Sequence, residues 1–189
     1  MTLVVRVLRS VLVRLIALTA PLWLAAPAHA QIAQELAIKA SFIAKFVAFV
    51  KWPPPREGGS GADSGVFRVA VFGENPFHDE LETALRKAAP ASVPVRVETV
   101  RDVRDLRGHK LIFIGAAEKG SVAKLSAWAQ ANGALTIGDG DGFAGEGVII
   151  NFYRAGSKVR FEINTAAAER SGFQISSLLL KVARIVEDR

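Results

Sequence analysis

The tetrapeptide Leu111-Ile112-Phe113-Ile114 is apolar at every position. Successive side chains of a strand point to opposite faces of a sheet, so an unbroken apolar run predicts a strand that is covered on both sides. Such strands are typical of parallel sheets whose two faces carry helices. The stretch therefore predicts an α/β fold.

The sequence on either side of this run alternates between strand-like and helix-like segments. We expect further strands at Phe67–Phe72, Val95–Val100 and Leu135–Ile137, with helices at Pro76–Ala88 and Val122–Ala131. Two later segments, Val148–Tyr153 and Lys158–Ile163, surround Ala155-Gly156 and predict a hairpin. The expected architecture is a single α/β domain with a mostly parallel, Rossmann-like sheet, flanking helices and a late β-hairpin.

Helices are also expected near both ends of this region. Apolar residues spaced by three and four predict a first helix over Gln31–Lys51, which the prolines at 53–55 end. Asn164 or Thr165 is expected to cap a short helix that stops at Gly172. Ser176 is expected to cap a last helix, whose apolar face is Leu178, Leu179, Val182, Ile185 and Val186.

Residues 1–30 have the pattern of a cleavable signal peptide. Arg6 and Arg9 form a positive start, an apolar run follows, and Ala28-His29-Ala30 matches the site that signal peptidase accepts. An uncleaved membrane anchor is the alternative, but Arg14 interrupts the apolar run and shortens it. We expect cleavage after Ala30, a mature domain over residues 31–189, and a periplasmic location.

Composition excludes several classes of function. There is no cysteine, so thiol chemistry and cysteine metal sites are ruled out. Three of the 24 cations lie within residues 1–30, which leaves 21 cations against 18 anions in the expected mature chain. These charges are mixed in sign, as in Arg101–Arg107, so we expect no nucleic-acid partner.

No motif predicts catalysis, a metal or a cofactor. Gly140–Gly145 fits G-x-G-x-x-G, but a strand-like segment follows it where a dinucleotide site needs a helix. The same loop lacks the ligands of a calcium-binding loop. His78 and His109 have no second histidine at metal spacing, and we expect both to be solvated.

A few polar and aromatic positions are candidates for binding a partner. Arg160, Glu162 and Asn164 alternate with apolar residues and should share the face that points away from the core. They form either a solvated face or a partner patch, and Trp52 is either a core residue or an anchor for a partner. Asn151, inside an apolar strand, is expected to be a hydrogen-bonded structural amide.

The order of these segments resembles that of the YfiR family. The matching stretches cover essentially the whole expected mature chain, and they are Lys39–Phe46, Phe49–Pro53, Val71–Phe77, Leu135–Asp139, Gly142–Ala144, Ile150–Phe152, Arg160–Asn164, Ile175–Ser177, Leu179–Leu180 and Ala183–Arg184.

The resemblance implies a non-enzymatic periplasmic regulator. Members bind the periplasmic sensor domain of a membrane diguanylate cyclase of the YfiN type, silence it and keep c-di-GMP low. An outer-membrane lipoprotein of the YfiB type can sequester the repressor. Independently of the resemblance, the aromatic stripe of the first helix, Phe42, Phe46, Phe49 and Trp52, has two readings: it packs in the core, or part of it forms a partner or homodimer surface. This chain departs from familiar members because it has no cysteine pairs, and because Ala44-Lys45 replaces a common Tyr-Asn pair.

Two other readings remain open at the level of sequence. The chain could be a periplasmic module that binds a small ligand, such as an anionic or nucleotide-like solute, in the crevice at the carboxyl ends of the strands. It could also be a hydrolase whose active site forms only on folding.

Overall fold

A computed structural model describes residues 26–54 and 65–188 of the chain. The chain divides into two compact units, Met1–Glu35 and Leu36–Arg189. Most of the expected signal peptide lies outside the described residues. Among those that are described, no helix combines the length and the apolar character needed to cross a bilayer.

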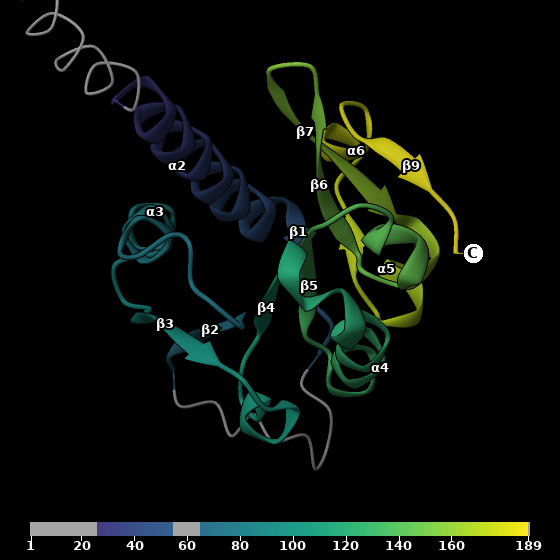
Figure 1. Ribbon diagram of the computed structural model, residues 1–189. Coiled ribbons are helices and arrows are strands. Elements are labelled where there is room, and N and C mark those ends of the chain that lie inside the picture. Colours follow the sequence, from purple (N-terminus) through teal and green to yellow (C-terminus); the bar gives the residue numbers. More distant parts are fainter. Residues whose placement is uncertain (1–25, 55–64, 189) are drawn as a thin grey trace, which may run out of the picture. The chain divides into compact units, whose positions relative to one another are not determined.

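The second unit is built on a seven-stranded sheet (Figure 1) in the order β3-β2-β4-β5-β6-β7-β9. Neighbouring strands from β3 to β6 run parallel, β7 is antiparallel to β6, and β9 is parallel to β7. The strands are β2 (Phe67–Phe72), β3 (Val95–Val100), β4 (Leu111–Gly115), β5 (Leu135–Asp139), β6 (Ile150–Ala155), β7 (Lys158–Asn164) and β9 (Arg184–Val186). The α/β fold with a mostly parallel sheet and a late hairpin is confirmed.

Helices cover both faces of this sheet, as the apolar run at 111–114 predicts. Leu111 and Phe113 lie in one buried cluster, with residues of α2 (Ala26–Phe49) and α3 (Glu80–Ala88). Ile112 and Ile114 lie in a second cluster, with residues of α4 (Val122–Asn132). Alternate side chains of one strand therefore anchor helices on opposite sides of the sheet.

Two smaller features close the structure around the first helix. A short antiparallel ladder joins β1 (Val50–Lys51) to β8 (Gln174–Ile175), so the predicted first helix ends two residues early and becomes a strand. Asn164 caps α5 (Thr165–Arg170) by accepting a hydrogen bond from the backbone of Ala167. Short 3₁₀ segments, Val103–Leu106, Ala116–Ser121 and Phe143–Glu146, fill the connections.

The predicted last helix is wrong beyond its first turn. Ser176 does cap α6, but α6 spans only Ser177–Leu180, and the chain then enters β9. Val182 and Ile185, which the helical spacing placed on a core-facing stripe, are 68% and 49% exposed. β9 supplies hydrogen-bond partners to the otherwise open edge of β7, an interaction across the sheet that local spacing cannot reveal.

Candidate functional site

The predicted polar patch on β7 is mostly buried. Arg160 is exposed, but Glu162 is only 4% exposed and Asn164 is fully buried. The expectation that the three side chains share a face open to solvent is therefore wrong for two of them. The side chains at the start of β7 are largely exposed. Those of its second half, from Phe161 to Asn164, are buried on both faces of the sheet, and there β7 is paired with β6 on one side and β9 on the other.

Glu162 joins three neighbouring strands. Its Oε1 accepts a hydrogen bond of 2.9 Å from the Asn151 amide on β6, and its Oε2 accepts two from the Arg184 guanidinium on β9. The hydrogen bonds to Glu162, followed by its charge, raise the pKa of Arg184 above its ordinary value despite some burial. The guanidinium carbon also lies 3.9 Å from the centre of the Tyr153 ring, a cation–π contact. This network holds the sheet edge together.

The other two amides are also structural. Asn151 donates to the backbone oxygen of Gly140 at 2.9 Å, which confirms the expected satisfied amide. Asn164 donates to the Ala144 backbone oxygen at 2.7 Å and to Asp188 at 2.5 Å, while its Oδ1 caps α5. Because their donors and acceptors are already used, these side chains are not available to a partner.

The glycine-rich loop is a packing feature rather than a phosphate site. A Cβ at Gly140 would lie 2.3 Å from the Phe143 ring, so the ring packs directly against the glycine backbone. Phe143 itself is 1% exposed within the second core cluster. The strand β6 follows this loop, as the sequence predicts. Across residues 26–54 and 65–188, no three acidic or histidine side chains come close enough to hold a metal ion.

A cavity of about 500 Å³ lies at the amino ends of β2, β3 and β4. The amino-terminal residues of β2 and β3 and the residue just before β4 line it, namely Phe67, Val95 and Lys110. The crevice expected for a ligand was at the opposite, carboxyl ends of the strands. Gly108 and His109 also line it. The rest of the lining comes from the end of α2 with Trp52 and the prolines after it, the end of α3 with the residues that follow it, and the end of α4 with Gly133.

Trp52 forms part of the cavity wall and is held by aromatic contacts. Its ring makes edge-to-face contacts with Phe67 and Phe173, with centroid separations of 5.5 and 5.3 Å. It is half-buried and packs against the first core cluster. Of the two sequence-based readings, these contacts favour a structural residue, one part of which faces the cavity.

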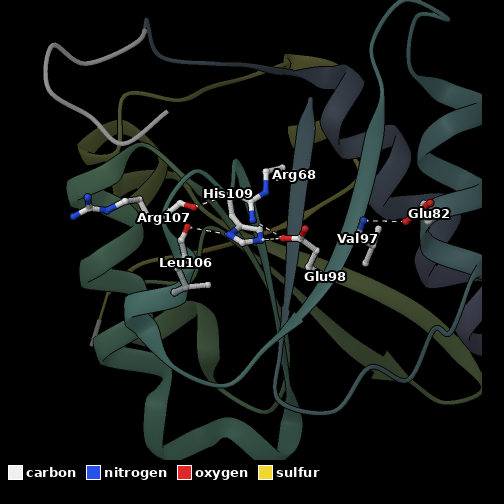
Figure 2. Close-up of polar contacts among 7 residues, drawn as sticks. All are labelled: Arg68, Glu82, Val97, Glu98, Leu106, Arg107 and His109. Carbon is white, nitrogen blue, oxygen red and sulfur yellow. Dashed lines mark hydrogen bonds and ion pairs between the residues drawn. The ribbon is translucent and has the colours of Figure 1, made fainter. Parts of the chain in front are cut away.

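A buried histidine, His109, is one of the residues that line this cavity. The His109 side chain is 1% exposed, so the expectation that it is solvated is wrong. Its Nε2 is 2.9 Å from Glu98 Oε2, and its Nδ1 is 3.1 Å from the backbone oxygen of Leu106 (Figure 2). Both partners are acceptors, so both bonds form together only when each ring nitrogen carries a hydrogen. The residue is buried because Gly108, at φ +84°, turns the chain from the 3₁₀ segment into β4.

Glu98 lies between the side chains of Arg68 and His109. Its Oε2 also accepts a hydrogen bond of 2.6 Å from Arg68 on β2, whose other terminal nitrogen reaches the Arg107 backbone oxygen. Burial raises the pKa of Glu98, but hydrogen bonds and charge from Arg68 and His109 outweigh it and hold the pKa below its ordinary value of 4.5. The carboxylate thus ties β3 to β2 and to the turn before β4.

The sequence of the chain places it in a known protein family. The sequence profile of the YfiR/HmsC-like family matches residues 36–184. The chain belongs to this family. Membership confirms the resemblance found from the motifs and supports, at the level of the family, a regulator of c-di-GMP signalling rather than an enzyme.

Solved structures with a similar fold are distant from this YfiR/HmsC-like chain in sequence. One is an ABC domain from Streptococcus pneumonia in complex with L-Trp, at 10% identity and a TM-score of 0.50, covering 64% of this chain and 55% of that one. Another is a conserved domain protein from Vibrio cholerae, at 13% identity and a TM-score of 0.50, covering 82% of this chain and 60% of that one. The chain thus spans less than two thirds of either, and these similarities show the fold alone. No curated protein matches the chain.

The two residues that replace the common Tyr-Asn pair of YfiR members lie in different environments. Ala44 is buried and lines the cavity, whereas Lys45 is exposed.

The cavity was not predicted from the sequence. Its lining is dominated by alanines, valines and prolines from segments far apart in the chain, which carry no recognisable spacing.

Proposed function

We propose that the mature chain is a periplasmic regulator that binds the sensor domain of a YfiN-type membrane diguanylate cyclase and represses it. Repression would lower c-di-GMP, and a YfiB-type outer-membrane lipoprotein would relieve it by sequestering the regulator. The observation that carries this proposal is the family match over residues 36–184, within which the expected motifs follow one another in the family's order.

The sequence supports export to the periplasm. Arg6 and Arg9, the apolar run and Ala28-His29-Ala30 form a signal-peptide pattern directly before the family domain. A domain with an extensive apolar core also needs no disulfide to be stable outside the cytoplasm.

The exposed end of the β6–β7 hairpin is the best candidate for the partner surface. Arg154, Lys158 and Arg160 are all exposed there, and residues 153–160 contain no acidic side chain. Arginine presents several donors in a rigid fork that suits carboxylates. We therefore place the contact with an acidic surface of the cyclase sensor domain at this end of the hairpin, with Arg160 as its central residue.

Capture from membranes tests the proposal. Tagged mature protein, its Arg160→Ala variant and a control variant, Lys87→Ala, are incubated with solubilised membranes of the native host, and the retained proteins are identified. Lys87 is an exposed cation on α3. Wild type and Lys87→Ala should retain a membrane diguanylate cyclase, and Arg160→Ala should retain at least tenfold less, as expected for a central interface arginine. Retention of no cyclase by the wild type would contradict the proposal.

A small-ligand-binding module is the second candidate function. The cavity at the amino ends of β2, β3 and β4 favours it, because its volume is in the range of small-molecule sites. The two functions are compatible, since a bound ligand could act on the regulator.

A further inference from the structure

We propose that this cavity binds an aliphatic molecule with a single carboxylate, such as a medium-chain fatty acid, and that Lys110 pairs with the carboxylate. The inference rests on the cavity and not on the proposed cyclase partner, and it can be tested on the purified protein alone.

The cavity has fixed walls with an apolar, largely aliphatic lining. Leu85 and Val95 are 2% and 4% exposed, and Trp52 is held by its two aromatic neighbours. An alkyl chain entering such a pocket gains roughly 0.8 kcal/mol for each CH₂ group that it buries. The aliphatic part of the lining is Ala44, Val47, Ala48, Pro53, Pro54, Leu85, Ala88, Ala89, Pro90, Val93 and Val95.

The charge of the lining favours an anion. Among the described residues that line the cavity, Lys110 and His109 have basic side chains and none is acidic. His109 is already paired with Glu98, but Lys110 has no ion pair with any residue in the described part of the chain. The Lys110 backbone is fixed on both sides, since its nitrogen donates to Arg68 at 2.9 Å and its oxygen accepts from Leu135 at 2.8 Å. The backbone of Lys110 is therefore held at the cavity, and its flexible side chain can bring the ammonium to a carboxylate.

The same lining selects against a second polar group on the ligand. Apart from His109, Lys110 and the two tryptophan indoles, the described lining has one polar side chain, that of Asn132. Its amide nitrogen already donates to the Trp128 backbone oxygen. A zwitterion would find no carboxylate for its ammonium group. An uncharged alkyl chain carrying one acid group is the chemistry that matches.

The stretch of sequence that follows the prolines of the lining contains no apolar segment that could fill the cavity. Residues 55–64, which connect Pro54 to Gly65, read Pro-Arg-Glu-Gly-Gly-Ser-Gly-Ala-Asp-Ser and contain no large apolar side chain. Burying them would gain little hydrophobic stabilisation. The matching occupant is therefore a separate molecule.

Calorimetric titration with four probes below their micellar concentrations tests the inference. The probes are decanoate, decanol, decyltrimethylammonium and 2-naphthoate, each added to the mature protein. Decanoate should bind with the highest affinity, decanol more weakly, and decyltrimethylammonium not at all. Decyltrimethylammonium binding as tightly as decanoate would overturn the proposal, and so would naphthoate binding while decanoate does not.

Three variants locate the site. Lys110→Met keeps the side-chain length and should weaken decanoate binding about tenfold without changing decanol binding, as expected for loss of one charge-assisted contact. Ala48→Phe puts a ring into the cavity from an exposed helical position and should weaken both ligands. Lys87→Met, on a residue outside the lining, should bind as wild type does. Undiminished binding by folded Lys110→Met or Ala48→Phe would show that the probes bind elsewhere and would refute the assignment.

Discussion

Glu162 is the polar residue on which the end of the sheet depends. It is almost completely buried, yet it carries a charge, which is tolerated because Asn151 and Arg184 supply hydrogen bonds to both of its oxygens. Strict alternation along β7 predicted it to face solvent beside Arg160. The prediction failed because alternation distinguishes two faces of a strand but cannot show that β9 and its neighbours cover the polar one.

Removing the Glu162 carboxylate should destabilise the fold, whereas removing the Arg160 side chain should not. Glu162→Ala removes one of the two acceptors of the buried Asn151 amide and the carboxylate acceptor of the Arg184 guanidinium, which should lower the free energy of unfolding by about 1–3 kcal/mol. Arg160→Ala, on the same strand but exposed, should change it by no more than about 0.5 kcal/mol. Urea denaturation of both variants measures the difference. Equal, small effects would contradict the structural role of Glu162.

Glu98 should contribute stability that depends on pH. Its pKa in the folded state lies below 4.5, so its contribution is complete above that pH and is lost as pH falls through the folded-state value. Glu98→Gln should be less stable than wild type at pH 7 by about 1 kcal/mol, because the side chain is partly exposed. The difference should shrink towards pH 3. Urea denaturation across this range measures it, and a constant difference would show that the ionised form is not preferred by folding.

Helix α2 is fastened to the sheet by aromatic packing and by an ion pair. Phe42 and Phe46 contact Phe152 on β6 and Phe161 on β7, with ring centroids 4.8–6.4 Å apart. These contacts favour the core-packing reading of the helix's aromatic stripe, although Phe49 is 42% exposed. One turn before Phe42, Lys39 pairs with Asp139 at the carboxyl end of β5.

The ion pair between Lys39 and Asp139 should show a measurable coupling energy. Their side chains are 8% and 24% exposed and their charged atoms lie 2.7 Å apart. A double-mutant cycle with Lys39→Met and Asp139→Asn should give a coupling of about 1–3 kcal/mol in the free energy of unfolding. The pair Asp102–Arg104, whose side chains are 40% and 89% exposed, is the control and should give a much smaller coupling. Equal couplings would mean that burial does not strengthen the pair.

Elements could be predicted from sequence where local pattern and tertiary environment agree. β2 and β3 have the predicted bounds, because their residues are apolar enough and their turns are marked by glycine or proline. β9 was missed because its three residues have no signal stronger than the helical spacing around them. The cavity and His109 were missed because they depend on which strand ends come together, and that follows from strand order rather than from any one segment.

At the scale of the whole molecule, the two ends of the sheet have different chemistry. The amino ends of β2, β3 and β4 carry an apolar cavity with a lysine, while the β6–β7 hairpin presents exposed cations. The first feature suits a small acid and the second suits an acidic protein surface. Together they fit a YfiR-like regulator that contacts its partner through one part of the domain and binds a ligand in another.

The level of c-di-GMP in a deletion strain tests the regulatory role most directly. The strain must express a membrane diguanylate cyclase of the YfiN type, and it is complemented with either the full chain or a chain lacking residues 1–30. Deletion should raise c-di-GMP, the full chain should restore the low level, and the chain lacking residues 1–30 should not. Unchanged c-di-GMP after deletion would contradict the account.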